Sequence, residues 1–135
     1  MKTVKLLYAL ALVVAFCTLQ SSSCSKNDDI IAVPQTPVDG NWRIDLYFDN
    51  SDETHKFAGY SFIFNSTGQL TANNGSNTVT GTWSQGSNKL NISFGTTPVF
   101  SDLNDDWLIE EKTTASIKLK DDNPARLEKL QFIKL

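Results

Sequence analysis

An alternating stretch near residue 40 limits the fold of this chain more than any other segment. Between Trp42 and Asp49, apolar side chains take every second position: Trp42, Ile44, Leu46 and Phe48. Side chains of a β-strand point alternately to its two faces, so this period of two predicts a strand with one buried face. A Gly-x-Trp turn at Gly40 opens the strand. The rest of the chain must therefore supply further strands that close onto this one.

Seven more strand candidates follow the first. Strand formers and turn residues, chiefly Thr, Ser, Asn, Gly and Phe, dominate beyond residue 40, which favours an all-β class. Asn73-Asn74-Gly75 is a strong hairpin signal, because Asn and Gly tolerate a positive φ. The eight predicted strands are Trp42–Asp49, Phe57–Asn65, Gln69–Asn73, Thr78–Ser84, Lys89–Phe94, Trp107–Glu111, Ala115–Lys120 and Arg126–Leu135.

The order and spacing of these strands predict a closed barrel. Short connections between successive strands indicate antiparallel neighbours in sequence order, which is the meander topology. Each strand has a strongly apolar face, but the sequence offers no amphipathic helix to cover it. A sheet without such a cover closes on itself, which also removes its unpaired edges. We therefore expect a small antiparallel up-and-down β-barrel of about eight strands, with room inside for at most a modest ligand.

Four short motifs are spread along the expected barrel. They are Gly40-Asn41-Trp42, Gly81-Thr82-Trp83, Asp106-Trp107-Leu108-Ile109 and Leu130-Gln131-Phe132. Together they resemble the lipocalin superfamily, and more closely the short lipocalin-like domains of Bacteroidota lipoproteins. The resemblance implies a lipocalin-like domain over residues 40–135. In lipocalins an Arg near the end of the last strand stacks on the first Trp, whereas here Lys134 is at that end and Arg126 is at the other.

The first 23 residues are typical of an export signal and are excluded from the fold. Lys2 and Lys5 form a short positive region, and residues 6–19 are apolar and uncharged. This apolar run is too short to span a bilayer comfortably as a permanent helix. Three serines then lead directly to Cys24. We therefore expect residues 1–23 to be a signal peptide.

The position of Cys24 resembles the bacterial lipoprotein signal, in which a peptidase cuts before a Cys that then carries acyl chains. Ser21 stands where Leu is usual in that signal. The resemblance implies that Cys24 is lipidated, that residues 24–39 are a tether, and that the protein is an outer-membrane lipoprotein. Asp28 and Asp29 fit in part the acidic signal for surface export, which favours the cell-surface face over the periplasmic face. Two alternatives stay open: an ordinary thiol after a normal cleavage site, and an uncleaved anchor.

Several classes of function find no support in the sequence. The net charge of −3 gives no electrostatic reason to expect a nucleic-acid partner. No Gly-rich phosphate loop, Ser nucleophile motif or His-based triad is present, so we expect no enzyme and no cofactor. His55 is the only His, so a surface loop is favoured over a metal ligand. The acidic segments 49–53, 102–106 and 121–123 lack EF-hand spacing, so we interpret them as turns and expect no metal.

The longest connection, Gly95–Asp105, carries Val99, Phe100 and Leu103, which are apolar for a loop. Meander topology places this loop at one end of the barrel, so we expect it to fold over that mouth as a lid or plug. Most of the aromatic residues are expected in the core. If the barrel has a ligand site, the predicted residues are Phe48, Phe94, Phe100 and Leu103.

Two functions remain open at this point. In the first, the barrel binds a small apolar or amphipathic molecule by burying its apolar surface in the mouth. In the second, a filled barrel serves as a non-catalytic structural or interaction module of a cell-envelope complex. The expected partners are the membrane, through acylated Cys24, and either a small ligand or an envelope protein. A cavity under the long loop favours the first function, and a packed interior with an exposed aromatic patch favours the second.

Overall fold

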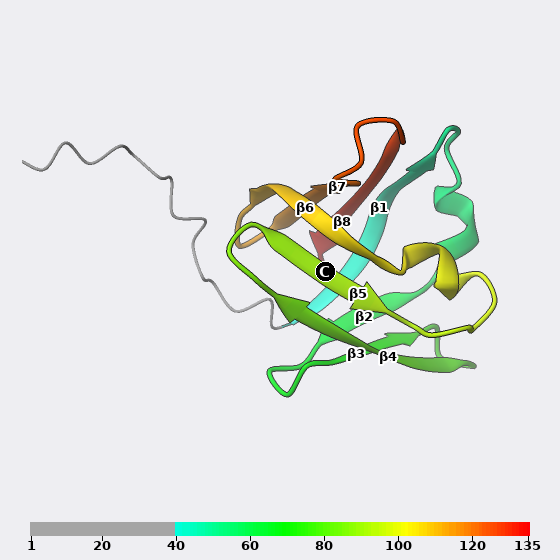
Figure 1. The fold of residues 1–135 in the computed structure, drawn as a ribbon. Coiled ribbons are helices and arrows are strands. Elements are labelled where there is room, and N and C mark those ends of the chain that lie inside the picture. The colour runs from blue at the N-terminus through cyan, green and yellow to red at the C-terminus, as the bar shows by residue number, and fades with distance from the viewer. Residues whose placement is uncertain (1–39) are drawn as a thin grey trace, which may run out of the picture. The chain divides into compact units, whose positions relative to one another are not determined.

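The computed structural model describes residues 40–135, which form a closed barrel of eight antiparallel strands in sequence order (Figure 1). The strands are β1 (Asn41–Asp49), β2 (Ser61–Phe64), β3 (Gln69–Asn73), β4 (Thr78–Gln85), β5 (Lys89–Ser93), β6 (Asp105–Lys112), β7 (Ser116–Lys120) and β8 (Glu128–Lys134). Two short 3-10 helices, η2 (Thr54–Phe57) and η3 (Phe100–Leu103), lie in the β1–β2 and β5–β6 connections. The predicted all-β class, strand order and closure are confirmed.

The predictions for residues 1–39, including the signal peptide, Cys24 and the tether, lie outside the described residues. Within residues 40–135, no helix has both the length and the apolar character needed to cross a membrane.

The strand predicted at Phe57–Asn65 is wrong in its first half. Residues 54–57 form η2 instead, and β2 begins only at Ser61. Gly59 between them has a φ of +81°, a left-handed conformation that no regular strand contains. The turn is held by the N–H of Tyr60, which donates to the carbonyl oxygen of Phe57 at 3.2 Å. The chain therefore turns before it enters β2.

The alternation predicted for the first strand is wrong beyond Ile44. The pairing of β1 with β8 shifts by one residue between Ile44 and Leu46. Such a bulge places every later side chain on the opposite face. Tyr47 is consequently buried in the core, and Leu46 and Phe48 are half-buried.

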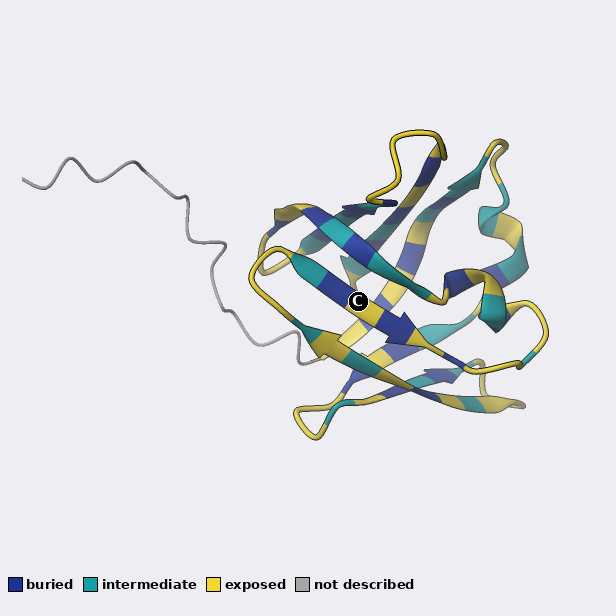
Figure 2. Cartoon of the chain, in the orientation of Figure 1, coloured by how far each residue is buried: buried dark blue, intermediate teal, exposed yellow. Residues whose placement is uncertain are grey.

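The interior of the barrel is filled by aromatic side chains. Figure 2 shows buried and exposed residues alternating along the strands, as expected for a barrel with one face inward. The ring centroid of Phe62 lies 5.5 to 6.5 Å from those of four other rings: Phe57, Phe94, Phe100 and Phe132. Edge-to-face contacts of this kind add to the stabilisation that burial of the rings provides. The core is therefore continuous from η2 to β8.

The ends of the first and last strands meet as the meander requires. The ammonium nitrogen of Lys134 lies 5.4 Å from the centroid of the Trp42 ring, within the range of a cation–π contact. Gly40 has a φ of +114°, and a Cβ there would lie 2.8 Å from the Lys134 Cε atom. The positive φ explains the glycine at this position, because side chains other than glycine rarely adopt it. Lys134 at the end of β8 therefore contacts Trp42 at the start of β1.

Candidate functional site

The β5–β6 connection folds inward as a plug, defined here as η3. Phe100 and Leu103 are 4% and 0% exposed, and the backbone carbonyl oxygen of Leu103 accepts a hydrogen bond from Trp107 Nε1 at 3.0 Å. The Phe100 ring lies 5.0 Å from Tyr60 and 5.2 Å from Phe94. The prediction that this loop closes the barrel mouth is confirmed, and the plug forms part of the hydrophobic core.

The structure brings three of the four predicted ligand residues together. Phe94, Phe100 and Leu103 all belong to the buried core around the plug. Phe48 does not join them, because the bulge in β1 turns it to the face opposite that of Tyr47. The predicted lipidation site, Cys24, lies outside the described residues.

A surface pocket of about 400 Å³ lies between β1 and β2. It exists because β1 pairs with β2 only at Asn41 and Trp42. Beyond Trp42 the two strands diverge, and η2 lies between them at the wide end (Figure 1). We call this space the β1–β2 pocket. Its lining residues are Arg43, Ile44, Thr54, His55, Phe57, Ala58, Gly59, Tyr60, Ser61 and Leu135.

The β1–β2 pocket has an apolar floor and a polar rim. Ile44 and Phe57 are buried, so their accessible atoms belong to the edge of the core. Arg43 and His55 are exposed, and they supply N–H donors from β1 and η2 respectively. Tyr60 is half-buried and connects this pocket to the plug through its contact with Phe100. The arrangement can hold a small molecule that has one apolar and one polar end.

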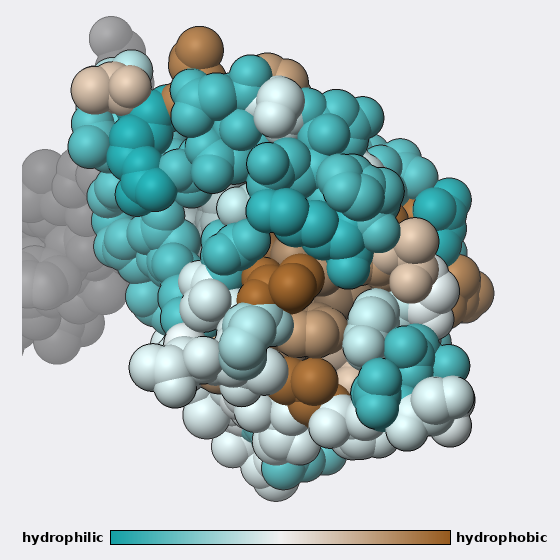
Figure 3. Space-filling view, turned by 90° about the vertical axis from the view of Figure 1, so that its right-hand side faces the viewer, coloured by the Kyte–Doolittle hydropathy of each residue, from teal (hydrophilic) through white to brown (hydrophobic). Residues whose placement is uncertain are grey.

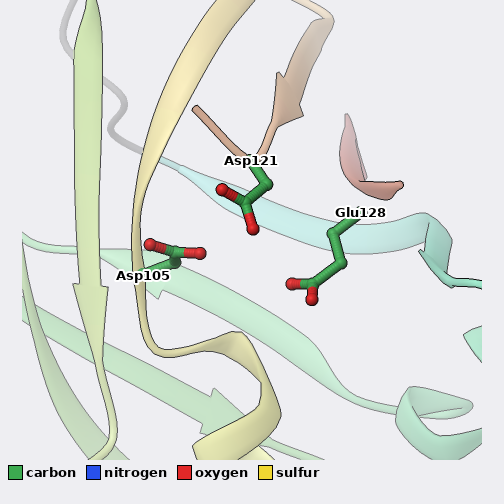
Figure 4. Close-up of side chains that lie close together, drawn as sticks. All are labelled: Asp105, Asp121 and Glu128. Atoms are coloured by element: carbon green, nitrogen blue, oxygen red, sulfur yellow. The ribbon is translucent and has the colours of Figure 1, made fainter. Parts of the chain in front are cut away.

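A second group of side chains is acidic and largely buried. Carboxylate oxygens of Asp105, Asp121 and Glu128 lie within 4.8 Å of one another. Figure 4 shows these side chains reaching toward a common space from β6, the end of β7 and β8. Arg126 compensates part of their charge: its Nε lies 3.3 Å from Asp121 Oδ2, and its Nη2 contacts Glu128. We call these four residues the acidic cluster.

Burial raises the pKa of two carboxyl groups in the acidic cluster, Asp105 and Glu128. It raises the pKa of Asp105, and the nearby charge of Asp121 adds to the effect. Burial likewise raises the pKa of Glu128, although the guanidinium of Arg126 opposes this rise. Asp121 Oδ1 accepts a hydrogen bond from the N–H of Asn123 at 2.7 Å, which is the turn chemistry predicted for segment 121–123. The cluster is therefore a charge network with Arg126 as its counter-ion, and the absence of a metal stays a prediction.

Sequence reasoning missed both groups for different reasons. The β1–β2 pocket depends on how far β1 and β2 pair, and no alternation pattern reports this. Gly59 was the available signal, since a glycine inside an expected strand marks a bulge or a break. The acidic cluster joins Asp105 in β6 and Asp121, just after β7, to Glu128 in β8, and only the register of the closed barrel brings them together.

Comparison with known proteins supports the fold. No protein-family model matches the sequence, and no curated protein matches it. The chain is similar to a crystal structure of a DUF4847 family protein from Bacteroides vulgatus, with a TM-score of 0.53 and 16% sequence identity. The similarity covers 78% of this chain and 95% of that chain. At this level of identity the likeness concerns the barrel fold alone.

Proposed function

We propose that this protein is a lipid-anchored, lipocalin-like binding protein of the cell envelope, without enzymatic activity, that holds a small amphipathic molecule in the β1–β2 pocket. The observation that carries the proposal is the pocket itself. Its volume of about 400 Å³ falls within the range of roughly 300–1,000 Å³ that is usual for small-molecule sites. The barrel interior is a less suitable place, because the aromatic side chains around Phe62 and the plug occupy it.

Binding would follow from the two kinds of surface in the pocket. An apolar part of the ligand loses contact with water against Ile44 and Phe57, which is the main favourable contribution. A polar part stays at the rim, close to solvent. Since both surfaces belong to strands and to a short helix of the barrel, the site is formed before the ligand arrives.

The anchor rests on the sequence features of the first 24 residues and on the lipoprotein resemblance. More than one acyl chain on Cys24 gives stable membrane attachment without a spanning segment. We place the protein at the outer membrane, with the surface face favoured by Asp28 and Asp29.

The anchor is tested with Cys24→Ala. We expect this variant to leave the membrane fraction and its amino-terminal peptide to lose the mass of the acyl chains. Cys17→Ala is the matched control, because Cys17 lies inside the apolar run and should be removed with the signal peptide. Membrane retention of Cys24→Ala with an unchanged mass would contradict lipidation.

Ligand binding is tested by native mass spectrometry of the protein purified gently from an envelope extract. We expect a small adduct on the wild type and its loss in Ala58→Trp, because the added indole fills the pocket. Ala125→Trp is the control, since Ala125 is exposed in the β7–β8 connection. A bare wild-type mass after repeated extraction, or an adduct that Ala58→Trp keeps, would contradict the proposed site.

One observation supports a second candidate, a non-catalytic interaction module of an envelope complex. Figure 3 shows apolar side chains gathered in the middle of the end of the barrel that η2 and η3 cover. Val99, beside the plug, is among the large apolar residues that remain exposed. A bare mass in the experiment above would favour this second function.

A further inference from the structure

We infer that the molecule held in the β1–β2 pocket is a carboxylate, with its charged end at Arg43 and His55 and its apolar end on Ile44 and Phe57. This inference rests on the proposed function and specifies the chemical class of the ligand. Four features of the pocket support it: the charge of its lining, the donors that Arg43 has beyond its pair with Asp45, the donor on His55 and the apolar floor.

The lining of the pocket differs in charge from the chain as a whole. The chain has 15 acidic and 12 basic residues, so acidic side chains outnumber basic ones. Yet no Asp or Glu side chain lines the β1–β2 pocket, whereas one Arg and the only His do. An anion entering the pocket therefore meets a cation and no acidic side chain at its rim. A cationic ligand would meet the like charge of Arg43 and no acidic side chain with which to pair.

Arg43 has donors available for a ligand. Within residues 40–135, its ion pairs are confined to Asp45, which one terminal nitrogen, Nη2, approaches at 3.1 Å. Both partners are well exposed, at 48% and 39%, and an exposed pair of this kind contributes little free energy. A ligand carboxylate can bind the remaining donors, and two parallel N–H···O bonds to a guanidinium are the stronger geometry.

Other cations of the barrel are held more firmly. Lys56 contacts Glu53 and also Asp102 at 3.0 Å. Lys89 contacts Asp106 at 2.6 Å and also Asp122. Two carboxylates already satisfy each of these lysines. Arg43 differs from these two lysines in having one ion-pair partner within residues 40–135, and it lines the β1–β2 pocket.

His55 adds a donor from a different element. It lies in η2, so its position relative to Arg43 in β1 is fixed by the packing of Phe57 into the core. An imidazole carries at least one N–H in either of its charge states, so it can donate to a carboxylate oxygen. The two residues together distinguish a carboxylate from an alcohol of the same length, because a neutral hydroxyl gains no ionic contact with Arg43.

The test compares three eight-carbon probes that differ only in the head group: octanoate, 1-octanol and octylammonium. Binding to the mature chain is measured by isothermal titration calorimetry at one pH and salt concentration. We expect octanoate to bind about tenfold more tightly than octanol, as one charge-assisted contact at a half-exposed site provides, and octylammonium to bind most weakly. Arg43→Gln should weaken octanoate binding about tenfold and octanol binding much less, so that the advantage of octanoate disappears.

Lys118→Gln is the matched control. Lys118 forms one exposed ion pair, with Glu111 at 3.1 Å, and the two side chains are 43% and 47% exposed. It resembles Arg43 in pairing and exposure but does not line the pocket. Equal affinities for octanoate and octanol, or an octanoate affinity that Arg43→Gln leaves unchanged, would overturn the carboxylate inference while the proposed function stands. Failure of all three probes to bind would overturn both.

Discussion

Among single residues, Gly81 shows how a motif that is visible in the sequence acquires its physical reason only in the fold. A Cβ at this position would lie 2.7 Å from the Phe94 Cδ1 atom, and closer still to the carbonyl oxygen of Ser93. Gly81 and Ser93 lie on the paired strands β4 and β5, so neither neighbour can move without disturbing the sheet. The glycine therefore allows the Phe94 ring to pack closely against β4.

Replacing Gly81 with Ala should destabilise the barrel by about 1–3 kcal/mol, the usual cost of overpacking a well-packed interior. The free energy of unfolding from urea denaturation measures the effect. Gly86→Ala is the control: a Cβ there meets nothing within 4 Å, so we expect little change. If Gly81→Ala were as stable as Gly86→Ala, the close approach of Phe94 would not limit this position.

The residue scale also shows where sequence reasoning fails. The period of two correctly placed Trp42 and Ile44 in the core. After the bulge that follows Ile44, the side chain that points into the core is Tyr47, not Leu46. A tyrosine gave no signal of burial, because its hydroxyl needs a partner that the sequence does not reveal. That partner is the carbonyl oxygen of Asp102, to which the hydroxyl donates at 3.0 Å. Burial also raises the pKa of Tyr47, so the hydroxyl stays protonated and remains a donor.

Among the secondary-structure elements, the plug η3 joins the long loop to the core. Phe100→Ala should cost about 3–5 kcal/mol of stability, because it removes a ring that contacts Tyr60 and Phe94 and leaves a cavity. Ser101→Ala is the control in the same helix. Thermal unfolding followed by circular dichroism measures both. A Phe100→Ala barrel as stable as the control would mean that η3 is a loosely held lid.

The acidic cluster, where β6, β7 and β8 meet, predicts that the stability of the barrel depends on pH. Since folding raises the pKa of Asp105 above its ordinary 3.8, the folded chain holds that proton more firmly than the unfolded chain does. This contribution to stability is fully present below pH 3.8 and is lost as the pH rises through the higher folded pKa. Asp105→Asn should therefore be more stable than the wild type at pH 7, and this difference should shrink toward pH 4.

Asp52→Asn provides the control of opposite sign. Hydrogen bonds from Thr54, from its side chain first and then its N–H, hold the pKa of Asp52 below 3.8. Its contribution to stability is present above that value and is lost as the pH falls. Free energies of unfolding between pH 3 and pH 7 measure both variants. An Asp105→Asn protein that is less stable than the wild type at pH 7 would contradict the raised pKa of Asp105.

For the whole molecule, the architecture was accessible from the sequence and the site was not. Eight apolar alternating segments with short connections and no covering helix leave a closed meander as the solution, and the barrel confirms it. The β1–β2 pocket arises from a difference between neighbours: β1 pairs with β8 along its length and with β2 at two residues. Such a difference depends on the turn at Gly59 and on burial of Phe57, which are properties of the folded barrel.

The central claim is that a ligand binds in the β1–β2 pocket and not in the barrel interior, and locating the bound ligand tests it most directly. Amide chemical-shift changes on titration of the mature chain with octanoate locate the site. We predict that the changes centre on Arg43 and Ile44 in β1 and on residues 54–61, and that the amides of Phe94 and Leu103 stay unchanged. Changes centred on Phe94, Phe100 and Leu103 would place the ligand under the plug and contradict the account.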